Sequence, residues 1–268
     1  DRIAALALQG PLSREVLRNV VDADLDSLRF FGLAACHLAG AEGWITRTGY
    51  TGDLGYELWV PNADAITLYD AILEAGAEHG VQPIGLDALD VTRIEAGFVL
   101  QGIDYVSSRS CLIDARRSTP EDSGLGWTVN LEREGWIGRE ALLRERENGP
   151  KWNLVGLELD WAEIEDLHAE YELPPHLAPC ACREAVPVYL ASGKQVGQAT
   201  SSTWSPTLKR SLALAQVHRR HTSIGTKLQV EHTVEFERRR VTATVVDRPF
   251  FDPPRKTSTP NFPPKTPA

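Results

Sequence analysis

Residues 48–60, with the sequence TGYTGDLGYELWV, hold the side chains best suited to binding a ligand. In this run, alternate residues from Tyr56 to Val60 fall on one face of a strand, and Glu57 and Trp59 fall on the other. Three glycines precede or begin this strand and can adopt the positive φ values of a hairpin: Gly49, Gly52 and Gly55. Strand pairing would bring the carboxylate of Glu57 close to Tyr50, so this hairpin is a candidate binding surface.

A second candidate residue, Arg93, lies in the segment PIGLDALDVTRIEAGF. Asp87 and Asp90 favour the first turns of a helix there, and Gly97 is placed to end it. Arg93 follows Asp90 by three residues, so an ion pair along the helix is the alternative to ligand binding. The corresponding alternative for Glu57 is a solvated position on a strand.

One cluster has residue types that bind metals: His168, His176, Cys180 and Cys182. Zinc sites usually contain Cys-x2-4-Cys pairs, and a Cys-x-Cys pair after a proline-rich turn fits that pattern poorly. We therefore predict ordinary loop residues and no metal.

The composition excludes several classes of partner. A chain of 268 residues can form two domains with ordinary cores. Its formal net charge of -9 and pI of about 5.3 argue against a general binder of nucleic acids or anionic membranes. No apolar run reaches the roughly 18 residues of a membrane helix, and four scattered cysteines do not form a disulfide framework. A cytoplasmic protein is predicted.

The pattern of elements changes near residue 150. Residues 1–150 alternate helices and strands, whereas residues 151–248 contain about five short strands that predict a small β-barrel with a helical insertion near residues 161–179. Residues 249–268 are rich in proline and are predicted to form an extended tail. The fold class predicted is α+β.

Five segments occur in an order that resembles a known family: RTGYTGDLGYEL, GLDALDVTRIEAGF, WIGREAL, VGQATSSTWSPTLKRSLALAQV and VVDRPFFDP. They are similar to successive signatures of the aminomethyltransferase family, whose best-known member is the glycine cleavage T-protein. The resemblance implies a tetrahydrofolate-binding α+β core and a C-terminal β-barrel. Family members have a further region before the ALQGP segment, which includes the aspartate assigned to catalysis. We expect that region to lie outside this sequence, so the catalytic residue stays unknown.

The resemblance also implies three folate-binding residues: Tyr50, Glu57 and Arg93. A carboxylate such as Glu57 can accept both parallel donors of a pterin, the ring N–H and the exocyclic NH₂. Tyr50 can stack on the ring or contact its edge. Arg93 suits the anionic and carbonyl-rich remainder of folate. The other acidic candidates, Asp53, Asp87, Asp90 and Asp104, are explained as residues of turns or helix starts.

The function implied is tetrahydrofolate-dependent transfer of an aminomethyl or methyl unit, from a lipoyl carrier like the glycine cleavage H-protein or from a small molecule. Gln101 replaces an aromatic residue of the T-protein, and residues 105–126 form a longer, more polar loop. Arg109, Arg116 and Arg117 of this loop favour a small anionic donor. Two alternatives therefore remain: a folate-dependent demethylase of O-, S- or N-methyl compounds, and a folate-binding module without transfer chemistry.

Overall fold

The computed structural model describes residues 2–109, 111–113 and 116–261, and its chain forms two compact units. The first unit contains residues 1–92 and 251–268, and the second contains residues 93–250. Each mixes helices with an antiparallel sheet, and the second contains a closed barrel, so the predicted α+β class with a C-terminal barrel is confirmed. These two units are the parts of the chain within which residues contact one another most. The domains predicted from the sequence, with boundaries at residues 150 and 248, stay predictions.

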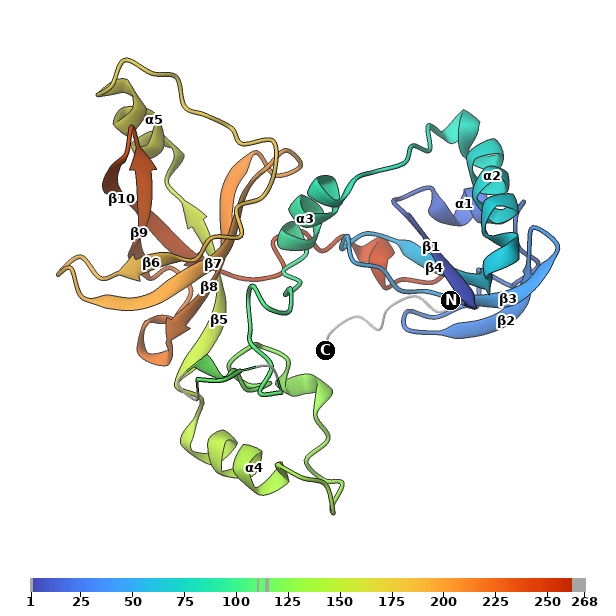
Figure 1. The fold of residues 1–268 in the computed structure, drawn as a ribbon, viewed down its shortest axis with the longest axis horizontal. Helices are drawn as coiled ribbons and strands as arrows, with labels where there is room; N and C mark the ends of the chain where they lie inside the picture. Colours follow the sequence, from blue (N-terminus) through green and yellow to red (C-terminus); the bar gives the residue numbers. More distant parts are fainter. Residues whose placement is uncertain (1, 110, 114–115, 262–268) are drawn as a thin grey trace. The chain divides into compact units, whose positions relative to one another are not determined.

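A four-stranded antiparallel sheet forms the centre of the first unit, in the order β1-β4-β3-β2 (Figure 1). Its strands are β1 (Ile3–Gln9), β2 (Leu33–Leu38), β3 (Ala41–Thr46) and β4 (Gly55–Pro61). Its helices are α1 (Ser13–Leu17), α2 (Ala65–Gly76) and the 3-10 turns Asn62–Asp64 and Ala77–His79. Tyr56, Leu58 and Val60 are fully buried in one core with α1 and α2, as the alternation predicts. The opposite face is available for other contacts.

The glycine-rich hairpin between β3 and β4 forms as predicted, but two of its glycines serve another purpose. Only Gly52 has a positive φ, of 78°. At Gly49 and Gly55 a Cβ atom would lie 1.9 and 2.0 Å from the side-chain oxygen of Gln9. The Gln9 amide occupies that space and donates to the carbonyls of Thr48 and Tyr56, both at 3.3 Å. These glycines therefore make room for a side chain that connects β1 to the hairpin.

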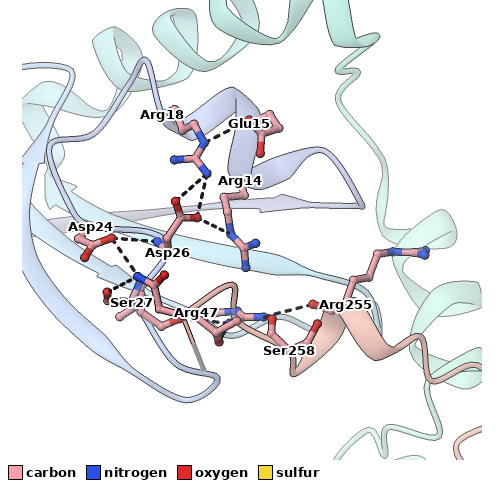
Figure 2. Close-up of polar contacts among 12 residues, drawn as sticks. Arg14, Glu15, Arg18, Asp24, Asp26, Ser27, Arg47, Arg255 and Ser258 are labelled. Atoms are coloured by element: carbon pink, nitrogen blue, oxygen red, sulfur yellow. Dashed lines mark hydrogen bonds and ion pairs between the residues drawn. The ribbon is translucent and has the colours of Figure 1, made fainter. Parts of the chain in front are cut away.

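The proline-rich C-terminal segment does not extend away from the first unit, which corrects the predicted tail for its described part. Residues 254–259 surround the guanidinium of Arg47, which is 1% exposed (Figure 2). Arg47 donates to the carbonyls of Arg255 at 3.2 Å, Lys256 at 3.1 Å and Ser258 at 2.5 Å, and to the Thr259 hydroxyl. Proline content alone does not reveal such docking, because the buried donor lies some 200 residues earlier.

A second contact fixes the same segment. Arg255 forms a two-pronged ion pair with Asp53 of the hairpin, at 2.6 and 2.7 Å. Burial lowers the pKa of Arg47, and the surrounding carbonyl dipoles solvate its charge in place of water. The described part of the C-terminal segment is thus fixed to the first unit by Arg47 and Asp53.

The second unit is built around a closed antiparallel barrel in the order β10-β5-β8-β7-β6-β9 (Figure 1). The strands are β5 (Trp152–Leu159), β6 (Val186–Tyr189), β7 (Gln195–Ser205), β8 (Arg210–His218), β9 (Lys227–Val234) and β10 (Glu237–Val246). The helices are α3 (Leu86–Glu95, which begins in the first unit), α4 (Arg139–Asn148) and α5 (Trp161–Ala169), with 3-10 turns at Gly126–Thr128, Arg219–His221 and, in the first unit, Pro254–Lys256. The sequence AVPVYLASGKQVGQATSS forms two strands separated by a turn, so the barrel has six strands instead of about five.

The predicted helical insertion forms α5. The Asp160 side chain caps it by accepting from the backbone N–H groups of Ala162 and Glu163. His168 of α5 lies against His232 of β9, with ring centroids 5.5 Å apart. The Nε2 atom of His232 is buried and has no hydrogen-bond partner among the described residues. Burial and the nearby His168 lower the pKa of His232 from its ordinary value of 6.5.

We expect Arg47→Met to lower the free energy of unfolding by roughly 2–4 kcal/mol, because several buried carbonyls lose their donor. Urea titration measures the loss, and limited trypsinolysis should show faster cleavage after Arg255 or Lys256. The control is Arg18→Met, which removes an exposed ion pair with Asp26 (Figure 2) and should cost about 1 kcal/mol or less. Equal losses in the two variants would contradict the role assigned to Arg47.

Stability should decrease when the pH falls below about 6.5, because the unfolded chain then protonates His232 while the folded chain resists it. Arg239 is the cross-strand partner of this histidine, and Glu170 pairs with Arg239. His232→Leu should therefore lose less stability than the parent between pH 7.5 and 5.5 in thermal unfolding. His176→Leu, at an exposed loop position, should retain the parent's pH dependence.

Candidate functional site

Glu57 lies on the sheet face of the first unit opposite the core, as its position in the alternation predicts. The hydroxyls of Thr46 and Thr48 donate to its Oε2 atom at 3.3 and 2.5 Å. Ala7 and Thr46 are its cross-strand neighbours. No hydrogen bond to its Oε1 atom comes from the described part of the chain. The two threonines therefore orient the carboxylate and leave one oxygen available to a ligand.

An aromatic surface adjoins this carboxylate. Trp59, two residues after Glu57 on the same face, pairs across the strands with Trp44. The two indoles are 36% and 45% exposed. Ala5 and Ala35 stand beside them in register, on β1 and β2. Small side chains on both sides leave a broad apolar surface, which is what a flat ring system requires.

Tyr50 lies in the turn between β3 and β4 and is half-buried. It is two residues from Thr48, which binds Glu57, so Tyr50 and Glu57 belong to the same hairpin. The same turn is held by Thr51, whose hydroxyl donates to Gln9 at 3.2 Å. Gln9 was not identified from the sequence as a residue of this site. The sequence feature that could have indicated it is the pair Gly49 and Gly55, which leave space for its side chain.

Arg93 belongs to the second unit, where its side chain is fully buried. Its guanidinium donates to the Phe98 carbonyl at 3.2 Å, to Asp104 Oδ2 at 2.6 Å and to the Ser201 hydroxyl at 2.8 Å. The contact with Asp104 is an ion pair between two buried side chains. The arginine thus connects the end of α3 to strand β7.

Asp104 lies in a turn, as the sequence predicts, and it also makes buried contacts that the sequence does not show. Its carboxylate is completely buried and accepts three hydrogen bonds besides its ion pair with Arg93. Oδ1 accepts from Thr200 and Ser201, both at 2.6 Å, and Oδ2 accepts from the Leu100 N–H at 2.8 Å as well as from Arg93. The available signal was the run of four hydroxyl residues from Thr200 to Thr203 in a strand of the predicted barrel.

The second candidate cluster, at residues 168–182, is spread over a helix and a loop. His168 Nδ1 lies 2.8 Å from the Ile164 carbonyl, while Cys180 and Cys182 are exposed. Within the described ranges no three His, Cys, Asp or Glu side chains are grouped so that they could hold a metal ion. No helix in those ranges combines the length and apolar character needed to cross a membrane.

Comparison with known proteins identifies the family to which the chain is similar. Residues 1–133 match the GCVT N-terminal domain, and residues 153–252 match the glycine cleavage T-protein C-terminal barrel domain. The chain is 34% identical to an aminomethyltransferase of Caldanaerobacter subterraneus subsp. tengcongensis and 36% identical to one of Halothermothrix orenii. Each alignment covers 94% of this chain, but only 59% and 62% of those relatives.

A solved structure agrees with these matches. The crystal structure of glycine cleavage system aminomethyltransferase T from Bartonella henselae superposes with a TM-score of 0.72 at 25% identity, over 93% of this chain and 60% of that one. This chain therefore spans about three fifths of the length of its relatives. With both domain types matched in order along the sequence, the chain belongs to the aminomethyltransferase (glycine cleavage T-protein) family.

Proposed function

We propose that the whole protein is a tetrahydrofolate-dependent one-carbon transferase and that this chain supplies part of its folate site. The observation that supports the proposal best is the Glu57 carboxylate, which two threonines orient on an exposed aromatic sheet face. Family membership makes folate the ligand to test there.

The chemistry of the donor set fits a pterin. With both lone pairs of Oε2 of Glu57 engaged by Thr46 and Thr48, the two lone pairs of its Oε1 can accept from the pterin donors. Tyr50 is proposed to contact the ring. Tetrahydrofolate would supply the nitrogen nucleophiles that accept the one-carbon unit. The protein's contribution is to orient the ring and to limit access of water.

Arg93 is the third residue proposed for folate binding. Since its guanidinium already donates to Phe98, Asp104 and Ser201, we assign it a positioning role. It holds residues 98–104 in place, and any effect on folate acts through that segment. A residue that carries out the chemistry is not assigned within this chain.

The donor is the second part of the proposal. The aminomethyl group of a lipoyl carrier protein is the donor that family membership favours, and a small methylated compound is the alternative that the polar segment after Gln101 favours. The assay offers the whole protein tetrahydrofolate with either the loaded carrier or a panel of methylated acids and amines. Formation of a one-carbon folate identifies the donor, and binding without product would indicate a folate-binding module. A cytoplasmic location is part of the same proposal.

Replacing Glu57 by glutamine should weaken tetrahydrofolate binding by about 1.5–3 kcal/mol, because the side chain loses its charge and one acceptor. Calorimetric titration of the whole protein measures the change. Glu42→Gln, an exposed carboxylate of β3 in the same unit, is the matched control and should bind as the parent does. Unchanged affinity in the Glu57 variant would remove this residue from the site.

Replacing Asp104 by asparagine removes the buried carboxylate that forms an ion pair with Arg93. We expect a loss of about 3–5 kcal/mol in the free energy of unfolding. If Arg93 positions a folate-binding segment, the same variant also binds folate more weakly at temperatures where it is folded. The control is Glu158→Gln, which removes a partly exposed ion pair with Arg210 and should change both quantities little. Loss of stability with full folate affinity would limit the pair to a structural role.

A further inference from the structure

The outer face of the barrel in the second unit contains a cavity of about 560 Å³ that the proposed folate chemistry does not use. Its lining comes from residues 103–106 and 116–118, from Asp122 and Ala185, and from strands β5, β7 and β8. All of these residues belong to the second unit, so the cavity is complete within it. Its volume is in the range of small-molecule sites.

Two glutamines form a hydrogen-bonding group in this cavity. Gln198 of β7 and Gln216 of β8 are direct cross-strand partners. The Gln216 Nε2 atom donates to the Asp104 carbonyl at 3.4 Å. Its Oε1 atom is buried and accepts no hydrogen bond from the residues that the structure describes. A buried acceptor without a donor costs free energy, so a ligand donor that reaches Oε1 through a small shift of the half-buried Gln216 side chain would relieve that cost.

The charge in the cavity favours an anion. Arg116 and Arg117 line it, and no ion pair joins Arg116 to a carboxylate of the described chain. The two acids in the lining are already engaged: Asp104 pairs with Arg93, and Asp122 accepts from the Trp152 N–H at 3.2 Å. Glu121, which the loop arginines could have paired with, instead binds Arg146. Arg109 is not part of the lining.

Two aromatic residues complete the lining. Tyr105 and Trp152 are both half-buried and border the same space as the arginines. Their rings offer flat apolar contact area, and a guanidinium binds a carboxylate through two parallel hydrogen bonds. The cavity thus combines a cationic group, a buried acceptor and aromatic contact area.

We propose that this cavity is a binding site for a small planar carboxylate that also carries a hydrogen-bond donor. Its carboxylate binds Arg116, its ring contacts Trp152 and Tyr105, and its donor satisfies Gln216 Oε1. The site is separate from the Glu57 surface, and its existence does not depend on folate binding.

Three probes test the two polar contacts one at a time: 4-hydroxybenzoate, 4-hydroxybenzamide without the charge, and benzoate without the donor. Calorimetric titration of the whole protein should show that 4-hydroxybenzoate binds about tenfold more tightly than the amide and about threefold more tightly than benzoate. Arg116→Gln should abolish the preference over the amide, and Gln216→Leu the preference over benzoate. Arg238→Gln, at an exposed barrel arginine, is the matched control and should retain both.

Three results would overturn the inference. One is absence of 4-hydroxybenzoate binding at millimolar concentration in the folded parent, and another is equal binding of all three probes. The third is competition by saturating tetrahydrofolate, which would place the probe in the folate site instead. Because Arg116 is exposed, its variant should fold normally, and circular dichroism verifies this. Failure of folate to bind at all would refute the proposed function and leave this site intact.

Discussion

The ion pair between Arg93 and Asp104 is the interaction on which the organisation of the second unit depends. Removing two charges from water costs several kcal/mol per ion, and the pair is worth forming only where further hydrogen bonds satisfy both groups. Here Thr200 and Ser201 supply donors from β7, and Leu100 supplies its backbone N–H. This network of hydrogen bonds fixes the chain after α3 against the barrel. It also sets the position of the Asp104 carbonyl, which holds Gln216 in the cavity described above.

The first unit also contains a buried arginine, but no carboxylate among the described residues compensates its charge there. Arg47 is buried among carbonyl groups. Four of its acceptors come from the C-terminal segment that the sequence predicts to be an extended tail. A buried cation surrounded by fixed dipoles tolerates no rearrangement of the backbone that provides them. The C-terminal segment is therefore bound to the hairpin that carries Glu57. Arg47, which binds this segment, directly follows Thr46, and Asp53 of the hairpin binds Arg255.

Local patterns predicted the features that depend on local physics. Alternation placed Tyr56 and Leu58 in the core and Glu57 opposite them, and the run of β-formers after residue 150 predicted the barrel. What the sequence could not show were partners far apart in the chain. The sequence places Asp104 in a turn but does not show its buried contacts, because Thr200 and Ser201 lie almost a hundred residues away. The resemblance of ordered motifs, and not periodicity, pointed to folate.

The glycines of the hairpin show why residue type alone was an incomplete guide. Positive φ and close approach both require glycine, and only the structure separates Gly52, which needs the first, from Gly49 and Gly55, which need the second. Close approach has the larger consequence for a binding site, because Gln9 joins β1 to the hairpin and makes the strand of Glu57 rigid on both edges. A carboxylate on a rigid central strand loses little conformational freedom when a ligand binds. Such a carboxylate is suited to the selection by hydrogen-bond donors that we propose for Glu57.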